Sequence, residues 1–265
     1  MTYPLFETLA IDQPAPHLLR VTLNRPQVHN AINTQMGLDF LALWTHLIED
    51  AGDCRCLLLT GSGERAFSAG GDLKERQGMS DAAWRRQHEI FERAYFALLE
   101  LPIPVIAVLN GLAYGGGLET ALACDFIYAA RHTRCALSEV RLGIMPGGGG
   151  TQNLARAVGE RRAKELIMRA QPFDAEQGLQ WGLFNHVFEG ADLMAEALKC
   201  ANEIAANGPL AVRQAKKSIH QGLQGDLLSG SRFEIEAYNR LVSSEDRHEG
   251  VLAFNEKRPP QFKGL

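Results

Sequence analysis

The chain has 265 residues, of which 46% are hydrophobic, with 27 Lys plus Arg against 31 Asp plus Glu and five cysteines. This composition is typical of a globular protein, and without a block of like charge it favours neither a nucleic-acid nor a membrane partner. An odd number of cysteines with no CxxC pair indicates neither a disulfide framework nor a zinc site. The opening MTYPLFETLAID lacks the regions of a signal peptide, and no apolar run approaches the ~18 residues of a membrane span, so we expect a cytoplasmic protein.

Four short apolar runs, closed by Gly, Asn or Pro signals or by charge, are predicted to be buried strands. They are residues 17–23, 56–60, 105–109 and 124–129. Between them, residues 34–50 and 81–101 carry apolar side chains at helical spacing. This alternation of strand and helix predicts an α/β fold with largely parallel pairing.

The strand signals fade after about Glu160, and helices are predicted to follow one another. Their ranges are residues 161–169, 191–206, 209–221 and 232–254, the last with at least one break. No short repeat and no low-complexity linker is visible, so a second independently folding domain is not required. We expect a core over residues 1–200 and a helical region over residues 201–265.

Three glycine-rich segments can line an anion site, because glycine lets backbone amides approach a ligand closely. They are GSGERAFSAGGDLKE at 61–75, NGLAYGGGLETALACD at 110–125 and SEVRLGIMPGGGGTQ at 138–152. A Walker loop requires GK[ST] where Thr151 and Gln152 follow the glycines, and GSGERA lacks the third glycine of a dinucleotide fingerprint. Both phosphate-loop interpretations are therefore rejected.

Two glutamates in these segments are candidates for acid/base chemistry. Glu119 falls in the first turn of a predicted helix after three glycines, where a glutamate that only stabilises the helix dipole is an equally good interpretation. Glu139 follows a turn-like segment, and its local sequence favours an exposed loop carboxylate. Two carboxylates in one apolar pocket would serve general acid/base catalysis, because burial and mutual repulsion push their pKa values apart.

The combination of SAGGDLKE, NGLAYGGGLE and LSEVRLGIMPGGGGTQ, with the two glutamates 20 positions apart (139 − 119), resembles the enoyl-CoA hydratase/isomerase, or crotonase, family. NRPQVHNAIN near the start and EGVLAFNEKRPPQFKG at the end match as well, so the resemblance covers nearly the whole chain. It implies a crotonase-type spiral of repeated ββα units and a C-terminal helical region that makes a homotrimer or a dimer of trimers. The phrases GGDLKERQGM, PGGGGTQNLARAVG and DRHEGVLAFNEKRPP look closest to the methylglutaconyl-CoA hydratase-like branch.

The resemblance implies a role for each matching residue. The backbone amides of Gly71 and Gly116 correspond to the family's oxyanion hole for the thioester carbonyl, although many relatives have Ala in place of Gly71. Glu119 corresponds to the glutamate that activates water, and Glu139 to the one that delivers a proton to Cα. The resemblance also implies residues that contact coenzyme A. Ala69, Asp72 and Leu73 correspond to the stretch around its adenine end, and Phe254 and Lys257 to residues that hold its nucleotide portion.

The implied activity is the addition of water across the α,β double bond of an acyl-CoA thioester. Coenzyme A is then part of the substrate, and no metal or redox cofactor is implied. Hydratases of the family generally keep both glutamates, whereas many isomerases keep one. A Δ3-Δ2 enoyl-CoA isomerase and a non-catalytic acyl-CoA-binding protein are the alternatives. We expect the acyl group to be selected by the stretch after Lys74 and by residues 84–96.

Overall fold

Six strands form the larger of two sheets in the computed structural model, which describes residues 4–265. In spatial order they are β1 (Leu9–Asp12), β2 (Leu18–Leu23), β3 (Cys56–Gly61), β5 (Val105–Leu109), β7 (Phe126–Ala130) and β10 (His186–Phe188). The β1–β2 pair is antiparallel and the other neighbouring pairs are parallel. A parallel sheet is buried on both faces, which explains why β3 and β5 are almost unbroken apolar runs.

A second sheet has four shorter strands, β4 (Ala66–Ser68), β6 (Leu112–Tyr114), β8 (Arg134–Ala136) and β9 (Phe173–Asp174), in that order. Strands β4, β6 and β8 pair in parallel, and β9 is antiparallel to β8. Each of the first three follows a strand of the larger sheet and is followed by a helix. The chain therefore repeats a ββα unit, with one strand of each unit in each sheet.

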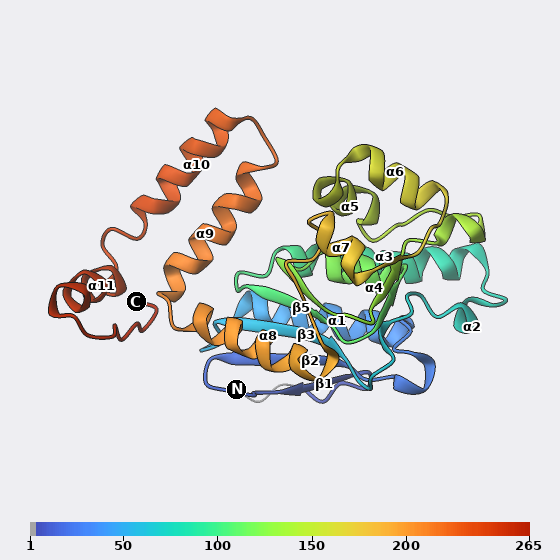
Figure 1. The fold of residues 1–265 in the computed structure, drawn as a ribbon, viewed down its shortest axis with the longest axis horizontal. Coiled ribbons are helices and arrows are strands. Elements are labelled where there is room, and N and C mark those ends of the chain that lie inside the picture. The colour runs from blue at the N-terminus through green and yellow to red at the C-terminus, as the bar shows by residue number, and fades with distance from the viewer. Residues whose placement is uncertain (1–3) are drawn as a thin grey trace.

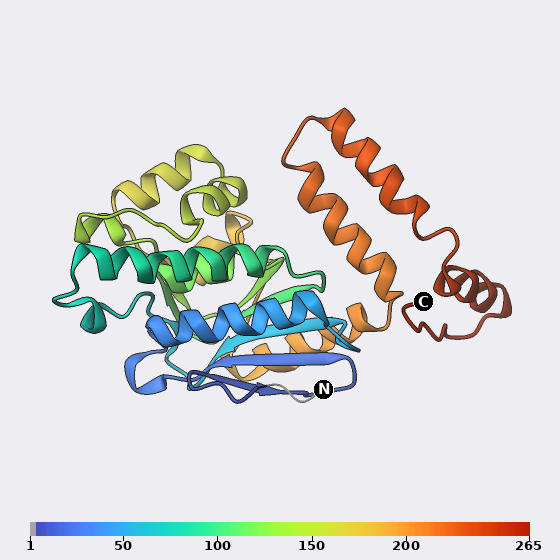
Figure 2. The ribbon, with the colours of Figure 1, turned by 180° about the vertical axis from the view of Figure 1, so that it is seen from behind.

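Helices cover both faces of the larger sheet. The α-helices of the described residues are α1 (Thr34–Glu49), α2 (Leu73–Arg76), α3 (Asp81–Leu99), α4 (Gly116–Leu122), α5 (Gly150–Val158), α6 (Glu160–Met168), α7 (Ala175–Gln180), α8 (Gly190–Ala205), α9 (Pro209–Gly222), α10 (Leu227–Asn239) and α11 (Glu245–Glu256). Figure 1 shows α8 on one face of the sheet, and Figure 2 shows α1 and α3 on the other. None of the described helices is both long enough and apolar enough to cross a membrane.

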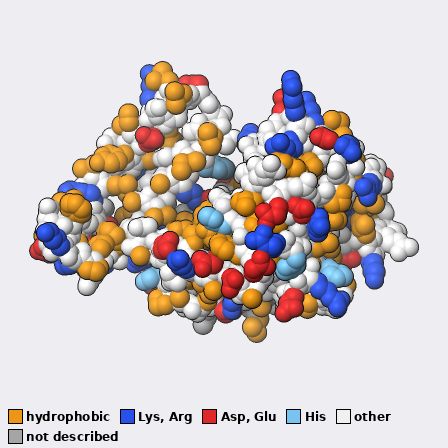
Figure 3. Space-filling model, viewed as in Figure 1, with side chains coloured by type: hydrophobic (Ala, Val, Ile, Leu, Met, Phe, Trp, Pro, Cys, Tyr) orange, Lys and Arg blue, Asp and Glu red, His pale blue; other side chains and the backbone are white. Residues whose placement is uncertain are grey.

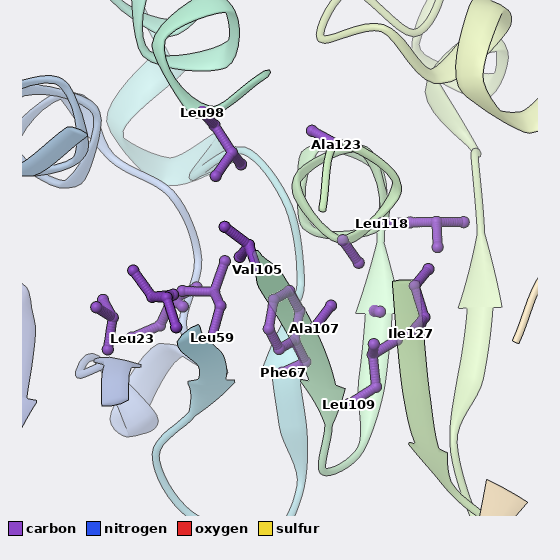
Figure 4. Close-up of a cluster of buried hydrophobic side chains, with 14 of the residues drawn as sticks. Leu23, Leu59, Phe67, Leu98, Val105, Ala107, Leu109, Leu118, Ala123 and Ile127 are labelled. Atoms are coloured by element: carbon purple, nitrogen blue, oxygen red, sulfur yellow. The ribbon is translucent and has the colours of Figure 1, made fainter. Parts of the chain in front are cut away.

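Alternate residues of each central strand enter two different cores. Leu57 and Leu59 of β3 pack with α1, α3 and α4, whereas Cys56 and Leu58 of the same strand pack under α8. Figure 4 shows part of the first core, with Leu59 among the side chains of neighbouring strands and of the helices above them. This alternation follows from the two-residue period of a strand, and it fixes the register of the sheet on both faces.

The C-terminal arm, defined here as α9, α10 and α11, extends away from the two sheets (Figure 1). Helix α8 packs on the larger sheet through Leu193, Ala197 and Ala201, so the predicted boundary between residues 200 and 201 lies inside a core helix. Large apolar side chains on α9 and α10 and at the turn between them are 60% to 86% exposed; they are Ile219, Leu223, Leu227, Leu228, Ile235 and Tyr238. Figure 3 shows hydrophobic side chains along this arm.

The prediction that strand structure ends near Glu160 is wrong, because β9 and β10 follow it. Strand β9 has two residues and β10 has three. Runs this short display no alternation of apolar and polar side chains, and their pairing with β8 and β7 depends on tertiary contacts. The prediction for the strand at residues 124–129 begins early, because Asp125 binds the β5 backbone instead, accepting a hydrogen bond from the Val105 amide at 2.7 Å.

Candidate active site

Three neighbouring strands of the smaller sheet end beside one cavity of about 540 Å³. Ala69 and Gly71 follow β4, Gly115 and Gly116 follow β6, and Glu139 follows β8. Because the strands are parallel and adjacent strands lie ~4.8 Å apart, their carboxyl ends meet at one edge of the sheet. Residues up to 70 positions apart (139 − 69) are brought together in this way.

The backbone amides of Gly71 and Gly116 lie next to each other in this cavity, since a Cβ built on Gly116 would be 3.8 Å from the Gly71 nitrogen. The bridge between Ile32 and Gly71 uses the amides of Ile32 and Asp72, so the Gly71 amide takes no part in it. Gly116 is the first residue of α4, where amides have no intrahelical acceptor and the helix dipole favours negative charge. Two adjacent N–H donors of this kind can stabilise an oxyanion.

Glu119 is buried, with 6% of its surface exposed, and two backbone amides bind its carboxylate. Oε1 accepts hydrogen bonds from Gly148 N at 2.8 Å and from Gly150 N at 2.9 Å. Burial raises the pKa of Glu119, and the hydrogen bonds from the two amides oppose that rise. A Cβ on Gly150 would lie 2.8 Å from Oε1, so this close approach requires glycine. The PGGGG segment therefore holds a carboxylate of the protein itself.

Glu139 begins the 3-10 helix η2 (Glu139–Leu142), and both of its carboxylate oxygens are buried. Within the described residues neither oxygen has a hydrogen-bond partner. Burial raises the pKa of Glu139 to about 7, and the charge of Glu119 acts in the same direction. The local prediction of an exposed loop carboxylate is thus wrong. Gly115 makes room for this side chain, because its φ is +50° and a Cβ there would lie 3.1 Å from Glu139 Oε1.

Aromatic and aliphatic side chains form most of the remaining cavity wall. They include Trp84, Phe91, Ala94, Tyr95 and Leu98 of α3, Phe40 and Trp44 of α1, and Leu142, Ile144 and Met145 after β8. One face of residues 84–96, part of the stretch expected to select the acyl group, therefore lines the cavity. Sequence analysis missed Arg76 and His88, the two basic residues of the wall. The Arg76 guanidinium lies over the ring of Trp84. An arginine eight positions before a tryptophan (84 − 76) is the sequence signal that could have indicated Arg76.

The residues predicted to contact coenzyme A are only partly brought together. Ala69 and Leu73 line the cavity, whereas the Asp72 side chain caps α2 and forms an ion pair with Arg25 at 2.9 Å. Phe254, which is 83% exposed, and Lys257 lie at the C-terminal end of α11. Figures 1 and 2 place α11 at the opposite end of the molecule from α2. Within one chain, these two residues do not reach the cavity.

Comparisons with known proteins identify relatives of the chain. Residues 15–265 match the family described as enoyl-CoA hydratase/isomerase. The chain is 40% identical over 240 residues to the short-chain-enoyl-CoA hydratase of Clostridium acetobutylicum, covering 90% of this chain and 91% of that protein. It is 39% identical over 246 residues to the mitochondrial methylglutaconyl-CoA hydratase of Homo sapiens, covering 91% and 72%.

The fold points to the same family. A crystal structure of an enoyl-CoA hydratase from Bacillus anthracis matches with a TM-score of 0.95 at 40% identity, and the match covers 98% of this chain and 100% of that one. The chain belongs to the enoyl-CoA hydratase/isomerase family. The crotonase-type fold implied by the sequence resemblance is confirmed.

Proposed function

We propose that this protein hydrates an enoyl-CoA thioester, using Glu119 and Glu139 as an acid/base pair and the amides of Gly71 and Gly116 as an oxyanion hole. The observation that carries the proposal is the convergence of two buried carboxylates and two adjacent backbone donors on one cavity. The carboxylates differ in their surroundings, because Glu119 accepts two backbone hydrogen bonds and no group in the described part of the chain donates to the oxygens of Glu139. Such a difference suits one group to act as base and the other as acid.

The proposed reaction begins with water held beside Glu119. This carboxylate takes a proton as the water oxygen bonds to the β carbon of the thioester. The electron pair of the double bond moves towards the thioester oxygen, whose developing negative charge the Gly71 and Gly116 amides stabilise. One such donor is typically worth ~3 to 4 kcal/mol. Glu139, protonated near neutral pH, then gives its proton to Cα.

We propose a small acyl group, because the cavity volume is about 540 Å³ and aromatic rings form much of its wall. Two of the relatives compared above are named for short-chain and for methylglutaconyl thioesters. For the coenzyme, we propose that Ala69, Asp72 and Leu73 hold the adenine end. Phe254 and Lys257 would act from a neighbouring copy, in a trimer or a dimer of trimers.

The test replaces each carboxylate by its amide isostere. We expect Glu119→Gln and Glu139→Gln each to lower kcat for hydration by at least ~100-fold, the usual scale for a positioned acid or base, while acyl-CoA still binds. Loss of the conjugated enoyl absorbance measures the rate, and Glu64→Gln, at an exposed position, is the control. Near-normal hydration by either variant would remove that residue from the mechanism. An isomerase would lose its activity with only one of the two changes.

A further inference from the structure

Arg76, the last residue of α2, holds its guanidinium against the wall of the cavity. The group lies over the Trp84 ring, 4.4 Å from its centroid, and 5.7 Å from the centroid of Phe91. Its Nε donates a hydrogen bond to Gln87 Oε1 at 2.8 Å. Gln87 is itself 3% exposed, and its amide nitrogen donates to Thr34 and Glu75. The guanidinium is therefore held in one orientation.

This charge has no carboxylate partner within ion-pair distance in residues 4–265. Glu75 accepts hydrogen bonds from the Thr34 amide and from Gln87 instead. The other basic residue of the wall, His88, is paired with Glu92 at 3.1 Å. Burial lowers the pKa of Arg76, and the charges of Glu75 and Glu119, neither of which is within ion-pair distance, oppose that fall.

The guanidinium is also close to the reaction centre. A Cβ built on Gly71 would lie 3.3 Å from one terminal nitrogen of Arg76 and 3.7 Å from the other. Gly71 supplies one of the proposed oxyanion amides, so an acyl chain whose thioester oxygen is bound there extends within reach of Arg76. Since Nε is occupied by Gln87, the two terminal nitrogens form the edge that remains for a ligand.

We propose that Arg76 binds a carboxylate at the far end of the acyl chain, so that the preferred substrates are enoyl-CoA thioesters of short dicarboxylic acids. The proposal rests on the hydratase function proposed above. The two terminal nitrogens of a guanidinium match the two oxygens of a carboxylate, and such bidentate pairs are stronger than neutral hydrogen bonds. Trp84 and Phe91 would enclose the apolar carbons between the carboxylate and the double bond.

The experiment compares kcat/KM for glutaconyl-CoA and for pent-2-enoyl-CoA, which has the same chain length and a methyl group in place of the carboxylate. We expect the wild-type enzyme to favour glutaconyl-CoA by ~10-fold or more, the scale of a charged hydrogen bond. Arg76→Met should lower that ratio by a similar factor, and Arg76→Lys should restore part of it. Arg85→Met, which replaces an arginine of α3 whose side chain is 73% exposed, is the matched control and should leave the ratio unchanged.

Each outcome decides between separate claims. Wild-type enzyme that hydrates neither thioester contradicts the proposed function itself. If wild-type enzyme hydrates pent-2-enoyl-CoA and glutaconyl-CoA with equal kcat/KM, the hydratase function is supported and the proposed role of Arg76 is overturned. An equal loss on both substrates in Arg76→Met also overturns it, because Arg76 would then act on the shared chemistry. If Arg76→Met does not fold, the test is whether wild-type enzyme prefers glutaconyl-CoA to its terminal methyl ester. Equal kcat/KM values for these two thioesters would overturn the proposal.

Discussion

The two carboxylates of the cavity show how strongly one residue depends on its immediate surroundings. Both are glutamates whose carboxylates are buried, yet two glycine amides bind the carboxylate of Glu119 and no described group binds that of Glu139. Hydrogen bonds to the charged form favour ionisation, whereas burial without partners favours the neutral form. This is why the pKa of Glu139 rises to about 7.

The rate of hydration should therefore depend on pH with a definite sign. Glu139 must carry a proton to protonate Cα, so kcat/KM should fall as pH rises through about 7 and this carboxyl ionises. At lower pH, kcat/KM should stay constant until Glu119, the base, becomes protonated. A pH profile of kcat/KM measures this. The slow residual activity of Glu139→Gln should lack the alkaline limb, and a wild-type profile that stays level across pH 7 would contradict the assignment.

At the scale of elements, the loop between η2 and α5 positions Glu119 through its glycines. Gly150→Ala should lower kcat by ~10 to 100-fold, because a Cβ 2.8 Å from Oε1 must displace the carboxylate, and small displacements of a catalytic group are costly. Steady-state kinetics on one enoyl-CoA thioester checks this. Gly225→Ala is the control, since a Cβ there meets nothing within 4 Å. A Gly150→Ala enzyme with normal kcat would show that these hydrogen bonds do not position the base.

The long elements could be predicted from the sequence and the short ones could not. The prediction of β5 matches the observed range because the whole strand is one apolar run, and the predicted start of α1 at Thr34 is correct because apolar side chains recur along that helix at helical spacing. Strands β4, β6 and β8 have three residues each, too few for a pattern. The proposed site residues directly follow these short strands. Glu119 could be placed in a first helical turn, but the burial of Glu139 depends on contacts with residues distant in sequence.

For the whole molecule, the exposed apolar side chains of the C-terminal arm predict self-association. Contiguous apolar surface of this kind marks interfaces between protein chains. Light scattering should give three or six times the mass of one chain. Leu223→Glu combined with Leu227→Glu should shift the protein towards monomer, whereas Gln224→Glu, in the same turn, should not. A monodisperse wild-type monomer at micromolar concentration would contradict the prediction.

Assembly and coenzyme binding are expected to be linked, because α11 is far from the cavity of its own chain (Figure 1). If Lys257 of a neighbouring copy contacts the nucleotide phosphates, Lys257→Ala should raise KM for acyl-CoA by several-fold. It should leave KM nearly unchanged for an acyl-pantetheine that lacks the nucleotide. Equal losses on both thioesters would indicate damage to folding or assembly instead. Unchanged KM on both would leave Lys257 with no role in binding.

The location of the site at three successive strand ends divides the chemistry among separable loops. The proposed oxyanion amides follow β4 and β6, and the proposed proton donor follows β8, each fixed by its own strand. A substitution of Glu139 would change where a proton is delivered and would leave the two proposed oxyanion amides in place. One thioester-activating platform can thus acquire a new reaction in evolution through changes confined to a single loop.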